Sequence, residues 1–303
     1  MAPTVSPMRQ IGPYTFTFGR RLVIVRYLTV PELKHIHQIE WSAVDYVIDD
    51  VLPVVAKCRD LPADYRRRLE RFATDMLPVI LAMNPSILAP SQTILDLFPG
   101  RPRELISPCA LSICTTFADA HWTAPDLRLV FFGTRSHVSS LEFLESLASA
   151  LATAAPRARL TLFFGRYAPR PLRRMQNVDN RAPLAWTDFR SMINNERFHI
   201  GLAPLGDTVF ARGRSITKIL DHGAAGVAGL YSDAPSYAPA VRHGETGLLL
   251  PPDPDVWIKE IVRLGQDRAS LRAMAEAGAT HAAQLGDPAK LRSFWLNRLG
   301  VSP

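Results

Sequence analysis

The sequence predicts an α/β protein with two Rossmann-like domains, and three observations support this prediction. The chain has 303 residues, enough for two domains of about 100 to 200 residues each. Hydrophobic residues make up 47% and charged residues 21% of the chain, a balance typical of folded globular proteins. Short apolar runs alternate with helical patterns along the sequence, which is typical of parallel βαβ units.

In the first half of the chain we predict three strands and one long helix. The apolar runs at residues 21–27, 45–49 and 87–89 have the length and composition of strands. Residues 64–83 carry apolar side chains at helical spacing, so we predict a helix that precedes the last of these strands.

We place the domain boundary between residues 99 and 125, because this stretch is rich in Pro, Thr and Ser and shows no sustained period. The predicted domains cover residues 1–115 and 116–285. A C-terminal helix at residues 286–303 could cross back to the N-terminal domain.

The second half contains the elements of a complete doubly wound domain with five strands. The clearest strands fall at residues 127–132, 160–164, 199–204 and 227–231. Predicted helices fall at residues 139–152, 189–195, 215–223 and 237–243, and terminal helices follow them. Residues 168–183 are polar and rich in Pro and Arg, so we expect an exposed loop there.

A net charge of +7 and a pI near 9.6 favour an anionic partner, which could be nucleic acid, an acidic membrane face or a phosphate-bearing small molecule. The densest cluster is Arg66, Arg67, Arg68 and Arg71. It fits either a solvated helix face or a patch that holds anionic lipid. The arginines lack an aromatic platform or a known recognition motif, which argues against specific binding of nucleic acid.

The three cysteines, Cys58, Cys109 and Cys114, form no CxxC pair and have no zinc-like spacing to histidines, so we expect buried, reduced thiols. The sequence contains no apolar run near the roughly 18 residues that span a bilayer, and residues 1–21 lack the apolar stretch of a signal peptide. We therefore expect a cytoplasmic protein, with the inner face of the membrane as a further location if the arginines hold lipid.

Ligands of open parallel sheets bind beyond the carboxyl ends of the strands, so the residues after each predicted strand matter most. After the strand at 127–132, Gly133 permits close approach of a phosphate to backbone N–H groups, and Arg135 adds a charged contact. An ordinary βα turn would explain the same residues.

The strand at 199–204 is followed by Arg214 and Lys218, which lie one helical turn apart near a helix N-terminus. Two cations at this place fit a diphosphate, although an exposed basic turn, with Asp221 as the surface partner of Lys218, fits as well. After the strand at 227–231, Ser232 could contact sugar or phosphate oxygens, and Ser236 could simply cap a helix.

Residues 198–264 resemble the donor-binding half of glycosyltransferases of the GT-B fold, in particular the group similar to family 4. The shared pattern is a strand ending in Pro-Leu, a basic residue followed by Ser, a Lys and an acidic residue on one helix, a strand ending near Ser, and a glycine turn before an apolar run. In this sequence the pattern falls, in the same order and spacing, at Arg214–Ser215, Lys218, Asp221–Gly226, Tyr231–Asp233, Tyr237, Val241 and Gly244–Leu250.

The resemblance implies that Arg214 and Lys218 neutralise the donor diphosphate and that Asp221 holds the ribose hydroxyls. The other donor-binding residues that it implies are Gly133, Thr134, Arg135, Ser215, Ser232 and Tyr237. Cations and a helix N-terminus stabilise the leaving group in this fold, so no metal and no cofactor are expected, and the resemblance implies a retaining reaction.

Two departures from the family pattern stand in the donor half. The first of two glutamates that the family carries would fall at Gly213, and the second is replaced by Asp221, which is one methylene shorter.

The N-terminal half resembles the acceptor domain less closely, as if its first strands were missing, so we expect a shortened domain. Asp49 and Asp50 end a predicted strand and could contact the acceptor hydroxyl or act as base, or they could form a capping or surface pair.

Taken together, the sequence predicts a glycosyltransferase that moves a sugar from a nucleoside diphosphate to a glycan or lipid-linked acceptor, in polysaccharide or glycoconjugate assembly. The alternative is a catalytically degenerate protein of the same fold that binds a nucleotide or a partner.

Overall fold

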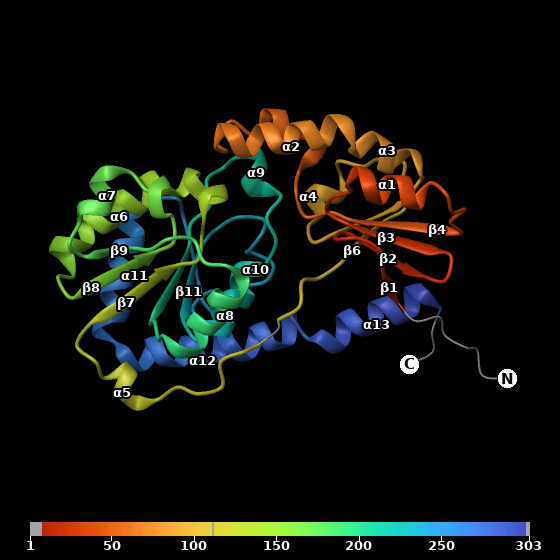
Figure 1. Ribbon diagram of the computed structural model, residues 1–303. Helices are drawn as coiled ribbons and strands as arrows, with labels where there is room; N and C mark the ends of the chain where they lie inside the picture. Colours follow the sequence, from red (N-terminus) through yellow and green to blue (C-terminus); the bar gives the residue numbers. More distant parts are fainter. Residues whose placement is uncertain (1–7, 111, 301–303) are drawn as a thin grey trace.

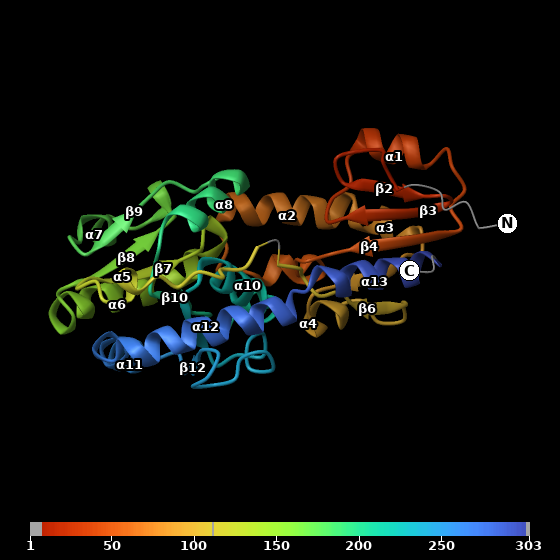
Figure 2. The same ribbon diagram turned by 90° about the horizontal axis from the view of Figure 1, so that it is seen from below.

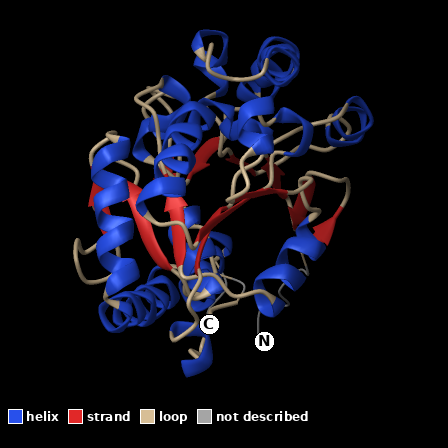
Figure 3. Ribbon diagram, turned by 90° about the vertical axis from the view of Figure 1, so that its left-hand side faces the viewer, coloured by secondary structure: helices blue, strands red, loops and turns tan. Residues whose placement is uncertain are grey.

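Two six-stranded sheets, each with its own helices, organise the chain (Figure 1). The computed structural model describes residues 8–110 and 112–300. The first sheet belongs to the N-terminal domain and the second to the C-terminal domain, and Figure 3 shows the strands enclosed by helices. The predicted α/β class with two Rossmann-like domains is therefore confirmed.

The N-terminal sheet has the order β1-β2-β3-β4-β5-β6. Its strands are β1 (Arg9–Gln10), β2 (Thr15–Phe18), β3 (Arg21–Val25), β4 (Ala43–Val47), β5 (Ser86–Ala89) and β6 (Arg103–Leu105). Strands β3 to β6 are parallel, whereas β1 and β2 pair antiparallel at the edge beside β3. This hairpin stands where a doubly wound sheet would continue with parallel strands, and the predicted strands at 21–27, 45–49 and 87–89 correspond to β3, β4 and β5.

Helices cover one face of this sheet because its parallel strands follow one another in chain order and each crossover is right-handed. They are α1 (Val30–Ile36), the 3-10 helix η1 (Leu52–Lys57), α2 (Ala63–Asp75), α3 (Leu77–Ala82) and α4 (Gln92–Leu95). Leu22, Ile24 and Tyr46 point toward them and are fully buried. The predicted helix at 64–83 is broken at Met76, because Pro78 has no N–H to continue the ladder of hydrogen bonds.

The C-terminal sheet is entirely parallel, with the order β12-β11-β10-β7-β8-β9. Its strands are β7 (Leu127–Phe131), β8 (Ala158–Leu162), β9 (Val178–Asn180), β10 (Ile200–Ala203), β11 (Ala228–Ser232) and β12 (Leu248–Leu250). Numbered within the domain, this is the doubly wound order 3-2-1-4-5-6, which reverses between β7 and β10. A ligand crevice is expected at that reversal, beyond the strand ends.

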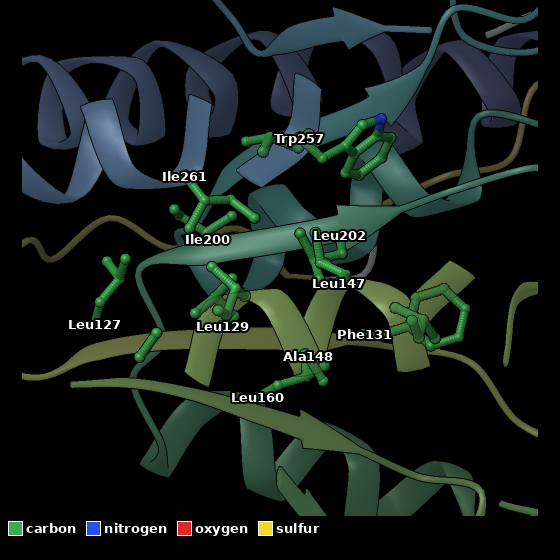
Figure 4. Packing of buried hydrophobic residues seen from close by; sticks show 14 of the residues in the cluster. Leu127, Leu129, Phe131, Leu147, Ala148, Leu160, Ile200, Leu202, Trp257 and Ile261 are labelled. Atoms are coloured by element: carbon green, nitrogen blue, oxygen red, sulfur yellow. The ribbon is translucent and has the colours of Figure 1, made fainter. Parts of the chain in front are cut away.

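Helices pack on both faces of the C-terminal sheet, which explains its continuous apolar strands. The helices of this domain are η2 (Arg135–Ser140), α6 (Leu141–Ala154), η3 (Gly165–Tyr167), α7 (Arg170–Arg174), α8 (Trp186–Asn195), α10 (Thr217–Ala225), α11 (Pro254–Gln266) and α12 (Arg268–Leu285), and α9 (Val209–Arg212) follows β10 but packs on the N-terminal domain. Leu129 and Phe131 pack with Trp257 of α11 on one face, as Figure 4 shows, and Phe132 packs with α8 on the other.

Three predictions for the second half are wrong. The sheet has six strands instead of five, since β9 lies within the predicted loop at 168–183, together with α7. The predicted helix at 237–243 is a series of turns, because Pro239 has no N–H with which to extend a helix. The predicted boundary region, 99–125, contains β6 and the short helix α5 (Asp119–Trp122); the boundary itself stays a prediction, so the wrong predictions are the strand number, the loop at 168–183 and the helix at 237–243.

The chain returns to the N-terminal domain through α13 (Pro288–Leu299), which continues the line of α12 beneath the first sheet (Figures 1 and 2). Arg298 donates a hydrogen bond of 2.7 Å to Asp45 of β4 and lies 2.7 Å from Glu104. Asp45 is fully buried and also accepts a hydrogen bond of 2.7 Å from Arg21. Residues 301–303 of the predicted C-terminal helix lie outside the described residues, and the division between residues 115 and 116 stays a prediction.

A second connection between the domains is made by α9. Phe210 belongs to the C-terminal domain in sequence but is buried in the core of the N-terminal domain. The Oγ1 of Thr208 donates to Asp60 at 2.9 Å, and the Oγ of Ser91 donates to the carbonyl of Gly213 at 3.2 Å. These contacts fix the segment that leads into α10. Of the three cysteines, all free, only Cys58 is buried.

Candidate functional site

A cavity of about 430 Å³, which we call the cleft cavity, lies between the two domains where the parallel strands of both sheets end. Val47 ends β4, Pro90 follows β5, and Ile106 follows β6 on the N-terminal side. Leu205 follows β10 on the opposite side. The cavity therefore occupies the edge at which parallel sheets bind ligands.

A second cavity of about 280 Å³, the side cavity, lies within the C-terminal domain. It opens beyond β7, where Gly133 and Thr134 line it, and reaches α8. Lys218 lines both cavities, and Asp221 lines the side cavity. The structure thus places five of the predicted residues along the cleft cavity, namely Asp49, Arg214, Ser215, Lys218 and Tyr237, and four along the side cavity, namely Gly133, Thr134, Lys218 and Asp221.

Arg214 reaches the cleft cavity as a half-buried cation without an acidic partner. Its Nη2 donates to the carbonyl of Ser136 at 3.1 Å, and its guanidinium carbon lies 4.3 Å from the ring centroid of Phe210. Among the ion pairs of residues 8–110 and 112–300, none includes Arg214. Burial lowers the pKa of Arg214, although Asp50 partly offsets this effect. Such a desolvated cation is ready to receive an anion.

Lys218 and Asp221 form an ion pair in the first turns of α10, with Nζ and Oδ2 2.8 Å apart. Their side chains are 17% and 13% exposed. The pair lies at the rim shared by the two cavities, near the N-terminus of α10, where the helix dipole favours anions. The sequence left open whether Asp221 binds a ligand or only Lys218, and the structure shows the Lys218 contact.

The carboxylates that follow β4 differ in environment. Asp49 lines the cleft cavity and lies 3.2 Å from Nε of Arg26, while Asp50 is 4% exposed and accepts a hydrogen bond of 2.7 Å from Nη2 of the same arginine. Desolvation raises the pKa of Asp49, against the opposing effect of Arg26. Asp50 does not line the cavity and forms a buried ion pair with Arg26, so its predicted contact with an acceptor stays a prediction.

Arg26 was missed from the sequence, although it follows β3 directly. Its backbone has a φ of 64°, a left-handed conformation that costs a non-glycine residue about 1–2 kcal/mol. This conformation lets one guanidinium reach both Asp49 and Asp50. Burial lowers the pKa of Arg26, but the two carboxylates outweigh it and raise the pKa overall.

His137 and Tyr237 complete the polar side of the cleft cavity. Burial, together with Arg214 and Lys218, lowers the pKa of His137 well below its usual range, so the imidazole is neutral at pH 7. Its Nδ1 lies 3.1 Å from the hydroxyl of Ser136. Burial raises the pKa of Tyr237, so its hydroxyl can donate a hydrogen bond.

The side cavity has an aromatic wall that sequence reasoning missed. Trp186, at the start of α8, is 56% exposed and stacks on Phe189 with ring centroids 5.6 Å apart. Phe132 lies edge-on to Phe189 at 5.2 Å. The exposed indole face is free to stack on a planar ligand group, and no spacing in the sequence distinguished Trp186 from a core residue.

No family model matches this chain, and no curated protein matches it. Several solved structures are similar. Sucrose-phosphate synthase from Thermosynechococcus elongatus superposes with a TM-score of 0.61 and 16% identity over 92% of this chain and 73% of that one. HepE from Anabaena, in complex with UDP-glucose, gives 0.59 and 15% over 85% and 72%.

TarM from S. aureus, in a complex that contains UDP, gives a TM-score of 0.62 and 9% identity over 89% of this chain, which spans 53% of that chain. At such low identities the similarity establishes the fold alone. The chain has the GT-B fold. This agrees with the resemblance inferred from residues 198–264, and the roles of individual residues stay predictions.

Two predicted donor-binding residues of the GT-B protein line neither cavity. Arg135 turns toward the N-terminal domain, where Nη1 lies 3.3 Å from Oδ2 of Asp64 and the guanidinium packs over Tyr65. Ser232 is buried, and its hydroxyl accepts a hydrogen bond of 2.7 Å from the backbone N–H of Leu205. Both make structural contacts, Arg135 between the domains and Ser232 between two strand ends, and their roles in donor binding stay predictions.

Gly213, at the position of the family's first glutamate, faces the N-terminal domain. A Cβ atom at this position would collide with Cγ1 of Val51. A glutamate at this position therefore requires Val51 to shift. The departure from the family pattern follows from the close contact of α9 with the N-terminal domain.

In the part of the chain that the structure describes, no group of three or more His, Cys, Asp or Glu side chains could hold a metal ion. An Asp-x-Asp triplet begins at Asp253, but this residue caps α11 by accepting a hydrogen bond of 2.9 Å from the N–H of Asp255. No helix within residues 8–110 and 112–300 combines the length and apolarity needed to cross a membrane.

Proposed function

We propose that this protein is a glycosyltransferase that takes a sugar from a nucleoside diphosphate and transfers it to an acceptor hydroxyl. The observation that carries the proposal is Arg214, a half-buried cation with no acidic partner among the described residues, next to Lys218 at the N-terminus of α10. Desolvated cations beside a helix terminus are suited to a diphosphate.

In the proposed complex, different parts of the nucleotide sugar bind in the two cavities. The diphosphate lies against Arg214 and Lys218, the ribose near Asp221, and the base in the side cavity against Trp186. The transferred sugar occupies the cleft cavity. The GT-B structures that bind UDP or UDP-glucose, TarM and HepE, support a uridine nucleotide as the first to test.

In the proposed reaction, the bond between the anomeric carbon and the β-phosphate oxygen breaks while the acceptor oxygen bonds to that carbon from the same face, so the configuration is retained. Arg214 and Lys218 stabilise the negative charge that develops on the diphosphate. Asp49 accepts the proton of the acceptor hydroxyl, and its raised pKa makes the carboxylate a better base. Metal independence and retention of configuration are part of the proposal, as is a hexose as the transferred sugar.

The family resemblance suggests a glycan or lipid-linked acceptor, in polysaccharide or glycoconjugate assembly. Contact between the α2 arginines and an anionic membrane face stays a prediction, as does the cytoplasmic location. In the structure, Arg66 lies 3.3 Å from Glu70 and Arg68 packs over Tyr65, so part of this cluster has partners within α2.

The second candidate function is nucleotide binding without catalysis, and Gly213 favours it because the site holds one acidic side chain fewer than the family pattern. A thermal-shift screen with UDP, GDP, CDP and dTDP tests the binding that both functions require. Incubation with the matching nucleotide sugars then separates them, because a transferase releases free nucleotide and a binding protein does not. A protein that none of the four nucleotides stabilises would contradict both functions.

A further inference from the structure

The cleft cavity is polar on one side and apolar on the other, and this difference indicates what kind of acceptor the cavity can bind. The C-terminal domain contributes charged and hydrogen-bonding groups, among them His137, Arg214 and Lys218. The opposite side, which we call the apolar wall, consists of Val47, Pro90, Ile106, Pro108, Leu291 and Trp295. Donor and acceptor must share one cavity, so the two sides indicate two ligands of different chemistry.

The apolar wall is assembled from four separate parts of the chain. Val47 and Pro90 stand at the ends of β4 and β5, Ile106 follows β6, and Leu291 and Trp295 project from α13. These α13 side chains lie one turn apart and are partly exposed. Arg298, one turn further along, fixes the helix to the buried Asp45 and so holds Trp295 at the cavity.

We propose that the acceptor is an alcohol or phenol carried on an apolar, ring-sized skeleton, bound against the apolar wall with its hydroxyl directed at Asp49. This inference rests on the proposed glycosyltransferase function, and it names an acceptor class that differs from the glycan or lipid-linked acceptor suggested by the family resemblance. A sugar acceptor would bring several hydroxyls to this wall, and each buried hydroxyl without a partner costs about 1–3 kcal/mol. Among the described residues that line this side of the cavity, the polar groups are the side chains of Asp49 and Ser107 and the indole N–H of Trp295.

The size of the cavity supports a small acceptor. Its volume of about 430 Å³ is near the lower end of the roughly 300–1,000 Å³ of small-molecule sites, and the transferred sugar takes part of it. An aromatic or alicyclic ring fits the remaining space against Trp295, which offers a flat apolar face. The structure therefore favours a compact apolar alcohol over an oligosaccharide.

The test uses the full-length protein with saturating UDP and compares two probes by saturation-transfer NMR. 4-Methylumbelliferone represents the apolar acceptor and methyl glucoside the polyhydroxylated one. We expect saturation transfer to 4-methylumbelliferone and a much weaker effect on methyl glucoside. With a UDP-sugar that the protein accepts, kcat/KM for 4-methylumbelliferone should exceed that for methyl glucoside by at least tenfold.

A matched pair of variants locates the effect on the apolar wall. Trp295→Ala should lower kcat/KM for 4-methylumbelliferone about tenfold and leave the Kd for UDP unchanged. Leu296→Ala is the control, because this neighbouring apolar residue on α13 is also partly exposed but does not line the cleft cavity. Its kcat/KM should stay within about twofold of the wild type.

Binding of UDP together with a preference for methyl glucoside would overturn the acceptor inference and leave the glycosyltransferase proposal intact. Equal losses in the two variants would also overturn it, since the wall would then have no specific role. Failure of the wild-type protein to bind any nucleotide would overturn the proposed function, and this inference with it.

Discussion

Replacing Arg214 with alanine should weaken binding of UDP about 10- to 150-fold. The guanidinium has one hydrogen bond, to the carbonyl of Ser136, and no ion pair among the described residues. Its loss would therefore remove contacts to the diphosphate without releasing a buried carboxylate. A hydrogen bond to a charged group contributes about 1.5–3 kcal/mol, and each 1.4 kcal/mol changes Kd about tenfold. Arg214→Lys keeps the charge but loses the planar guanidinium, so its Kd for UDP should lie between those of the wild type and of Arg214→Ala.

Isothermal titration calorimetry with UDP measures this effect, and Arg212→Ala is the matched control. Arg212 lies two positions earlier, is 57% exposed and pairs with Asp207 at 2.8 Å. Its loss should change the Kd by no more than about twofold, since exposed substitutions rarely exceed 0.5 kcal/mol. Urea denaturation of both variants checks that they are folded. Equal affinities of Arg214→Ala and Arg212→Ala for UDP would refute the phosphate role of Arg214.

Three further predictions concern the base, the domain contact and pH. Trp186→Ala should weaken the binding of UDP by about 1–3 kcal/mol, because the stacking of the base is lost, and the same titration measures this change. An unchanged Kd would exclude a base at the side cavity. Phe210→Ala should lower the free energy of unfolding in urea by about 3–5 kcal/mol, because Phe210 is buried. It should also weaken UDP binding, because Arg214 packs over the Phe210 ring. Val209→Ala is the control, and this change at an exposed neighbour should leave both quantities unchanged. Burial lowers the pKa of His199 and of His222 to about 3, so below pH 6.5 the unfolded chain binds more protons than the folded protein, and the free energy of unfolding decreases as the pH is lowered. Between pH 7 and pH 5, each histidine should lower the free energy of unfolding by about 2 kcal/mol. Equal unfolding free energies at the two pH values would contradict this.

The C-terminal domain could be predicted from the sequence because its strands are apolar on both faces and alternate with amphipathic helices. The short strands β1 and β9 were missed, since two or three residues carry no measurable periodicity. The break at Met76 followed from Pro78, which was visible in the sequence but was read as part of one helix. Local sequence patterns therefore predicted the order of the helices and strands more accurately than the residues at which they begin and end.

The site was predictable where function depends on position within a βα unit, as for Gly133 and Lys218. It was not predictable where contacts join the two domains. Arg135 pairs with Asp64, and Gly213 packs on Val51, and no local pattern connects such distant residues. Trp186 was missed for a different reason, because exposure beside a cavity is a property of the folded surface.

The central claim is that Arg214 and Lys218 bind the diphosphate of a nucleotide at the N-terminus of α10. A crystal structure of the protein with UDP tests it most directly. The account predicts phosphate oxygens within hydrogen-bonding distance of both side chains and the uracil ring against Trp186. A diphosphate bound elsewhere, with Arg214 and Lys218 free of it, would contradict the claim.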